Sequence, residues 1–150
     1  MKAATTLTIG KELADRICEH AVREYPHECC GALLGRDIGG DALTPDRRAI
    51  LDVLPFANRE ENSPHNRFSL TPEDVWAAEK RARERGMEVV GWYHSHPDHP
   101  AKPSEIDRKQ ALPWYSYVIV SVADEGAREL RSWHLNDDRS GYSEETIVTR

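Results

Sequence analysis

Two histidines one residue apart are the strongest chemical signal in this sequence. His94 and His96 lie at the end of an apolar and aromatic stretch that begins near residue 88. Alternate residues of a strand point to the same face of a sheet, so a strand that continues through residue 96 brings both imidazoles together. Asp107 follows after a turn rich in proline. Two imidazoles and one carboxylate are the ligand set of a catalytic zinc site whose fourth position is kept for water.

Simpler interpretations of these residues remain open at this point. A histidine on a strand is more often an ordinary surface or core residue than a metal ligand. Ser104 and Asp107 have the Ser-x-x-Asp spacing of a helix capping motif, in which both side chains accept hydrogen bonds from backbone N–H groups. A capping role does not exclude a ligand role, because a helix N-terminus also holds a carboxylate rigidly.

An acidic residue far upstream, Glu28, stands at the entrance of a second apolar stretch, residues 29–34. By position alone, a solvated charge at the end of a strand is the simpler interpretation. The adjacent pair Cys29 and Cys30 suggests a thiol nucleophile. A reactive thiol needs a neighbour that lowers its pKa, whereas Glu28 raises it. We therefore expect both cysteines to be small core residues.

Four of these residues fit one spaced pattern, His-x-His-x7-Ser-x2-Asp, from His94 to Asp107. The pattern resembles the signature of the JAMM (MPN-plus) metallopeptidases. Segment 26–35, PHECCGALLG, looks like the corresponding segment of the short bacterial and archaeal members, and the resemblance covers residues 7–122. It implies an α/β fold with a curved mixed β-sheet flanked by helices, of the cytidine-deaminase-like kind.

The resemblance also implies a role for each residue of the site. His94, His96 and Asp107 would hold Zn2+, which lowers the pKa of its bound water to about 7. Glu28 would be the general base, and Ser104 would donate a hydrogen bond to the oxyanion. If Ser104 acts in this way, we expect that its hydroxyl cannot fully cap the helix as well.

The implied reaction is amide or isopeptide hydrolysis at the C-terminal tail of a ubiquitin-like or sulfur-carrier protein. Short bacterial members of the family include enzymes that release cysteine from such a tail, and this is the leading specific expectation. The alternative within the class is an isopeptidase that removes a ubiquitin-like modifier from lysine. Nothing in the sequence separates the two.

Three other classes of function remain. One is a non-catalytic MPN-type binding scaffold, although such members lose the His-x-His or the Asp and this chain keeps both. Another is an iron(II) oxygenase, which also uses two histidines and a carboxylate. A third is a cysteine hydrolase that uses Cys29 or Cys30. His99 is a possible substitute ligand, but it lies beyond Pro97 and is expected to be exposed or to support a ligand.

Composition narrows the class of protein. The 150 residues suggest a single domain, residues 1–150, and 39% apolar residues are enough for a packed core. The formal charge of −6 argues against a nucleic-acid partner. No apolar run is long enough to suggest a membrane partner or a signal peptide, and an odd count of three cysteines fits a reducing compartment. We expect a cytoplasmic protein, with a homodimer as one open oligomeric state.

Hydrophobic periodicity and turn residues predict the elements that position the site. Thr71 followed by Pro72 predicts the start of a helix. Tyr25 followed by Pro26 predicts the end of an earlier helix. The pattern predicts loops at 36–46 and 58–66, with His65 as a surface residue. The expected helices span 10–24, 72–85 and 104 to about 113. The expected strands span 5–9, 29–34, 48–54, 88–96, 116–122, 127–135 and 142–148, with a further short strand at 67–70.

Overall fold

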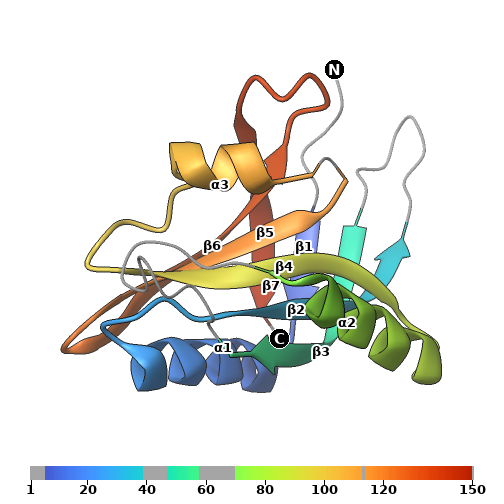
Figure 1. Cartoon of the computed structure of the whole chain (residues 1–150), viewed down its shortest axis with the longest axis horizontal. Helices are drawn as coiled ribbons and strands as arrows, with labels where there is room; N and C mark the ends of the chain where they lie inside the picture. The colour runs from blue at the N-terminus through green and yellow to red at the C-terminus, as the bar shows by residue number, and fades with distance from the viewer. Residues whose placement is uncertain (1–5, 39–46, 58–69, 113, 150) are drawn as a thin grey trace.

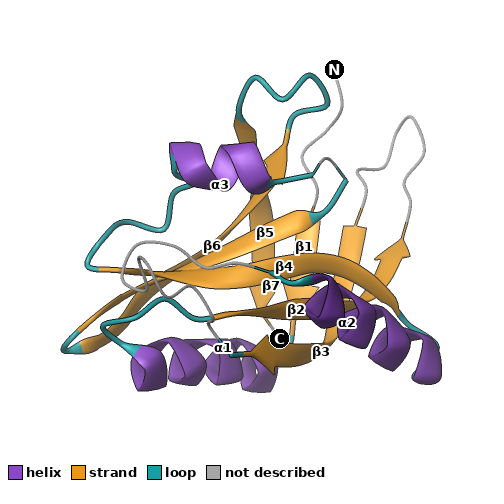
Figure 2. Ribbon diagram, in the orientation of Figure 1, coloured by secondary structure: helices purple, strands orange, loops and turns teal. Residues whose placement is uncertain are grey.

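The computed structural model describes residues 6–38, 47–57, 70–112 and 114–149. These ranges hold seven strands and three helices, arranged as one curved sheet with helices on both of its faces (Figures 1 and 2). In chain order the elements are β1 (Thr6–Ile9), α1 (Lys11–Glu24), β2 (Cys30–Ile38), β3 (Arg47–Phe56), α2 (Pro72–Glu84), β4 (Glu88–Pro97), α3 (Glu105–Gln110), β5 (Ser116–Ala123), β6 (Gly126–Leu135) and β7 (Tyr142–Thr149).

The sheet is mixed and closes on itself. Its strand order is β1-β3-β2-β4-β5-β6-β7, and β7 pairs with β1 to complete a barrel. The pairs β1–β3, β1–β7 and β4–β5 are parallel, and the other pairs are antiparallel. The expected α/β fold with a mixed sheet is confirmed. Closure was not predicted, because it depends on pairing between the two ends of the chain.

Helix α1 lies against the inner face of the curved sheet. Ile17 and Ala21 are fully buried there and pack with core residues of five strands, β1 to β5. Charged residues occupy most of the other positions of the helix, which is the amphipathic pattern expected from the sequence. The helix ends at Tyr25, directly before Pro26, because the residue preceding a proline resists helical angles.

Helix α2 covers the outer face of β2 and β4. Thr71 and Asp74 form a complete capping box at its start, with Pro72 in the first turn. Ala78 and Ala82 are buried against a second apolar cluster that includes Trp92. The start of the helix therefore agrees with the sequence prediction.

The largest differences from the predicted boundaries are at α3, which ends at Gln110 instead of near residue 113, and at the end of β2. Residues 36–38 were expected in a loop, but β2 continues through Ile38 and pairs with β3 down to Arg47. Gly35 permits this close pairing, since a Cβ there would lie 1.8 Å from the carbonyl oxygen of Ala49. The rest of that loop, the loop at 58–66 with His65, and most of the possible strand at 67–70 lie outside the described residues.

Strand β4 is the centre of the sheet. It pairs with β2 on one side and with β5 on the other, and every residue after Glu88 is buried. Gly91 allows the close approach of β5, because a Cβ at this position would lie 2.1 Å from the carbonyl oxygen of Ser116.

None of the described helices is long and apolar enough to cross a membrane.

Candidate metal centre

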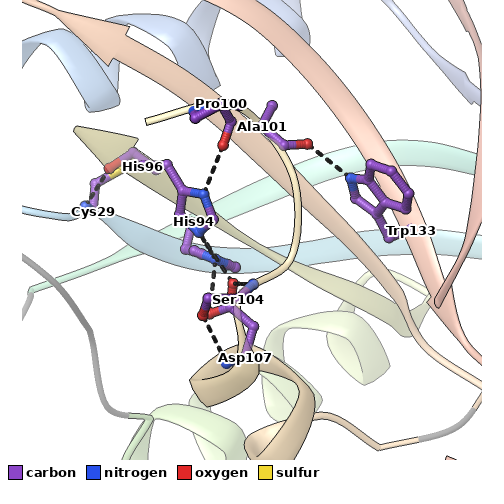
Figure 3. A network of polar contacts seen from close by, with 9 residues as sticks. Cys29, His94, His96, Pro100, Ala101, Ser104, Asp107 and Trp133 are labelled. Atoms are coloured by element: carbon purple, nitrogen blue, oxygen red, sulfur yellow. Dashed lines mark hydrogen bonds and ion pairs between the residues drawn. The ribbon is translucent and has the colours of Figure 1, made fainter. Parts of the chain in front are cut away.

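The two histidines lie at the C-terminal end of β4 and face the same side of the sheet. Figure 3 shows both rings directed toward the start of α3. The Nε2 atoms of His94 and His96 are 3.1 Å apart. Both side chains are almost fully buried. The prediction from strand alternation, that the two imidazoles lie on the same face of the sheet, is therefore confirmed.

Asp107, in the first turn of α3, completes a group of three. Its Oδ1 lies 3.3 Å from Nε2 of His94, and its Oδ2 lies 3.1 Å from Nε2 of His96. Ligands placed tetrahedrally at about 2.1 Å from zinc are about 3.4 Å from one another. The three side chains therefore fit a metal ion. They form the one such cluster of histidine, cysteine and acidic groups found in the described residues.

The protonation states suit metal binding. Burial lowers the pKa of His94, which outweighs the opposing effect of Asp107 and favours the neutral imidazole. Burial alone would raise the pKa of Asp107, but His94, His96 and the backbone N–H of Ser104 together hold it far below its usual range. A neutral imidazole and an ionised carboxylate are the forms that coordinate metals.

The loop after β4 orients His96. Its Nδ1 lies 2.9 Å from the carbonyl oxygen of Pro100, so Nδ1 carries the proton and the Nε2 lone pair faces the cluster. The next residue, Ala101, is held by both of its backbone groups. Its N–H donates to Glu129 at 3.1 Å, and its carbonyl accepts from the Trp133 indole at 2.9 Å (Figure 3).

Ser104 and Asp107 form a complete capping box at the start of α3. The Asp107 N–H donates to the Ser104 hydroxyl oxygen at 3.0 Å, and the Ser104 N–H donates to Asp107 Oδ2 at 2.8 Å. The complete capping box does not exclude the oxyanion role expected for Ser104. Capping uses the hydroxyl oxygen as an acceptor, whereas binding an oxyanion uses the hydroxyl proton.

Glu28 is buried, with 4% of its surface exposed, just before the first residue of β2. Burial raises the pKa of its carboxyl to about 8, and the negative charge of Asp107 acts in the same direction. The carboxyl group of Glu28 is therefore close enough to Asp107 to interact with it electrostatically. A solvated strand-end charge is therefore excluded by burial.

An apolar pocket of about 400 Å3 opens beside the cluster, and His94 and Asp107 form part of its wall. Trp92, two residues before His94 on the same face of β4, lines it together with three tyrosines. The lining residues are Leu70, Val75, Trp92, His94, Pro103, Asp107, Ala111, Leu112, Tyr115, Tyr117, Ile119 and Tyr142.

The remaining candidates from the sequence are not part of the cluster. Cys29 and Cys30 are fully buried, and burial raises the pKa of Cys29 to about 12, so its thiol is protonated at neutral pH. This is the behaviour of a core residue, as expected. His99 is exposed and offers its carbonyl oxygen to the hydroxyl of Ser121 at 2.7 Å.

Two residues that support the site, Ser95 and Trp133, were not predicted from the sequence. Ser95 was passed over, although a small polar residue between two candidate ligands in a buried strand is itself a signal. Its hydroxyl accepts the Cys29 N–H at 2.8 Å. Trp133 gave no local signal, because its contact with Ala101 joins residues 32 positions apart.

Known proteins share both the sequence and the fold. Residues 10–136 match the family described as prokaryotic homologs of the JAB domain. The chain is 35% identical to a CysO-cysteine peptidase of Mycobacterium tuberculosis over 133 residues, which cover 87% of this chain and 84% of that protein. It is 28% identical to a desampylase of Haloferax volcanii over 134 residues, covering 87% and 89%.

A solved structure from Desulfitobacterium hafniense has the same fold. Its TM-score is 0.80 at 32% identity, and the match covers 96% of this chain and 92% of that one. The JAMM resemblance of the sequence is thereby confirmed. The chain belongs to the family of prokaryotic homologs of the JAB domain and is a hydrolase of that family.

Proposed function

We propose that this protein is a zinc-dependent amide hydrolase that acts at the C-terminal tail of a ubiquitin-like or sulfur-carrier protein. The convergence of His94, His96 and Asp107 beside an apolar pocket is the observation that supports this proposal most. We further propose that residues 1–150 form a single domain that works in the cytoplasm. The three cysteines form no disulfide, which fits a reducing compartment.

Each residue of the site has a separate task in this proposal. A bound zinc ion supplies Lewis acidity and makes hydroxide available at neutral pH. Glu28 takes a proton from the attacking water at its carboxylate and passes it to the leaving amine. Burial and the raised pKa make it a stronger base than a solvated carboxylate. Ser104 donates a hydrogen bond from its hydroxyl group to the substrate oxygen as negative charge develops there. This interaction is worth about 3 kcal/mol.

Two kinds of substrate are in question. The leading candidate is a sulfur-carrier protein with cysteine joined to its C-terminus, as the name of the M. tuberculosis relative suggests. The second is a ubiquitin-like modifier joined to lysine. The pocket supports either, because its apolar walls suit an extended tail that passes the metal centre.

The metal is tested directly by elemental analysis of the purified protein. We expect about one zinc ion per chain, since the ligand set is that of a catalytic zinc site. His94→Ala and His96→Ala should each remove it, while Lys11→Ala, at an exposed residue of α1, should keep it. Iron in place of zinc would support the oxygenase alternative, and full zinc in both histidine variants would refute the assignment.

The reaction is tested by mass spectrometry of the products. The zinc protein is mixed with a sulfur-carrier protein bearing a C-terminal cysteine, and separately with a ubiquitin-like protein joined to lysine through an isopeptide bond. We expect cleavage of the first, loss of activity with a chelator, and recovery on addition of zinc. Cleavage of only the second substrate favours the isopeptidase. Cleavage of neither, with zinc bound, favours a binding scaffold.

A further inference from the structure

The segment that carries Glu28 belongs to no helix or strand. It connects the end of α1 at Glu24 with the start of β2 at Cys30, and the ladder between β2 and β4 begins only at the pair Cys30 and His94. Regular strand pairing therefore begins two residues after Glu28. Other contacts must hold its carboxylate in place relative to the histidines.

The first such contact is the hydroxyl of Ser95. It accepts the N–H of Cys29 at 2.8 Å, and the Ser95 N–H donates to the carbonyl oxygen of Cys29 at 3.1 Å. Both backbone groups of Cys29 are thus tied to one residue, the residue between the two histidines. The contact is fully buried, so water does not compete with it.

The second contact lies on the other side of Glu28. The Tyr25 hydroxyl donates to the carboxylate of Asp98, at 2.9 and 3.0 Å from its two oxygens. Asp98 comes directly after β4, and its N–H donates to the carbonyl oxygen of Val122 in β5 at 2.7 Å. The segment is therefore tied at both ends to the region that carries His94 and His96, across about 70 positions of sequence.

We propose that Ser95 and the Tyr25–Asp98 pair form a two-point clamp that positions Glu28 for proton transfer. This inference rests on the proposed function, because it assumes that Glu28 is the general base. A base must lie within hydrogen-bond reach of the proton that it takes. A displacement of about 1 Å costs on the order of 10²-fold in rate, so a loop residue needs such anchors.

The test compares Ser95→Ala and Tyr25→Phe with the wild type, all loaded with zinc. We expect kcat to fall by about 10-fold or more in Ser95→Ala and by a smaller factor in Tyr25→Phe, with KM and zinc content unchanged. The exposed Tyr25 contact is the weaker one because solvent competes with it. Ser95→Thr keeps the hydroxyl and should recover most of kcat.

A matched control separates positioning from general stability. Ser132 is also fully buried on a strand, and its hydroxyl donates to Glu145 at 2.6 Å, away from the cluster. Ser132→Ala and Ser95→Ala should both lower the melting temperature, but Ser132→Ala should leave kcat at the wild-type value. Equal losses of kcat in Ser132→Ala and Ser95→Ala would mean that Ser95 has only a structural role, and would overturn the clamp.

A second measurement does not depend on activity. In metal-free protein labelled with 15N, Ser95→Ala should speed hydrogen exchange of the Cys29 amide by at least 10-fold relative to Ser132→Ala. Unchanged exchange would overturn the clamp. The outcome for Glu28→Gln separates the two proposals. If that variant keeps full turnover, the proposed base is wrong. If it is inactive while Ser95→Ala and Tyr25→Phe are fully active, only the clamp is wrong.

Discussion

Burial disfavours the charged forms of Glu28, His94 and Asp107 around the candidate metal centre, but the net shift in pKa differs from one group to the next. It favours the neutral form of His94, which is the form that coordinates a metal. It also opposes the charge on Asp107, but two imidazoles and one backbone N–H more than compensate. At Glu28, burial and the charge of Asp107 act in the same direction and raise the pKa to about 8. The proposed metal ligand and the proposed general base are thus two nearby carboxyl groups with opposite pKa shifts.

Replacement of Glu28 tests this division at the residue scale. Gln has the size of Glu but cannot take a proton, so Glu28→Gln should lower kcat by about 10²-fold or more. Zinc should remain bound, because Glu28 is not one of the three clustered ligands. The measurements are steady-state hydrolysis and zinc content on the same sample. Loss of zinc would instead identify Glu28 as a metal ligand.

At the scale of elements, the capping residues of helix α3 are also residues of the candidate site. Its capping box places Asp107 Oδ2 against both the Ser104 N–H and the His96 ring. A helix of only six residues has little intrinsic stability, so its cap is a large part of what defines its start. The opposite wall of the site is β4, whose register with β2 and β5 fixes the direction of the histidines.

Two substitutions in α3 separate capping from chemistry. In Asp107→Asn the side-chain oxygen can still accept the Ser104 N–H, so the stability of the metal-free protein should change by less than about 1 kcal/mol. Zinc affinity should fall at least 100-fold, since a charged ligand is lost. Calorimetric unfolding and competitive zinc titration measure the two effects, and unchanged zinc affinity would leave Asp107 with a capping role alone.

Ser104→Ala should give the opposite pattern. It removes the acceptor for the Asp107 N–H and should destabilise the metal-free protein by about 1 kcal/mol. Zinc should stay bound, whereas kcat should fall by about 10²-fold through the loss of one donor to the oxyanion. A variant with lower stability and normal kcat would show that Ser104 only caps the helix.

For the whole molecule, strand pairing brings distant segments together. Glu28 and His94 are 66 positions apart in sequence, yet Glu28 lies two residues before Cys30, which pairs with His94. The same sheet wraps around α1, whose buried residues contact the apolar side chains of five strands. The site therefore depends on global folding, and ionisation within it is linked to the stability of the whole chain.

This linkage predicts how stability varies with pH in the metal-free protein. The folded pKa of Glu28, about 8, exceeds its ordinary value of 4.5. Its contribution to the free energy of unfolding is fully present below about pH 4.5 and is lost as the pH rises through about 8. Between these two pH values, each pH unit should lower the stability of the wild type relative to Glu28→Gln by at most about 1.4 kcal/mol.

The comparison of the wild type with Glu28→Gln isolates the contribution of Glu28 to the pH dependence of stability. The lowered pKa of His94 has the opposite effect, because stability is lost as the pH falls through the ordinary range of histidine, but both proteins share it. Urea unfolding at several pH values gives the difference. A constant difference from pH 4.5 to 8 would contradict the raised pKa of Glu28. Added zinc should reduce the slope, because a nearby dication favours the carboxylate.

Local patterns in the sequence were sufficient to predict the elements and three of the site residues as a group. His94, His96 and Asp107 lie within 14 consecutive residues, so strand alternation and a helix start bring them together. The cap at Thr71 was predictable for the same reason, because a capping box is completed within four residues. Interactions over such short distances depend on backbone geometry that the residues themselves set.

Only the tertiary structure decided the environment of these residues. The burial of Glu28, the contact of Ser95 with Cys29 and the anchoring of Ala101 by Trp133 all join segments that are far apart in sequence. Their relative positions depend on strand register and barrel closure, which arise from the packing of the whole sheet around α1. The sequence by itself determined which groups are available for chemistry. The fold determined which of them are buried, how they are protonated and what they face.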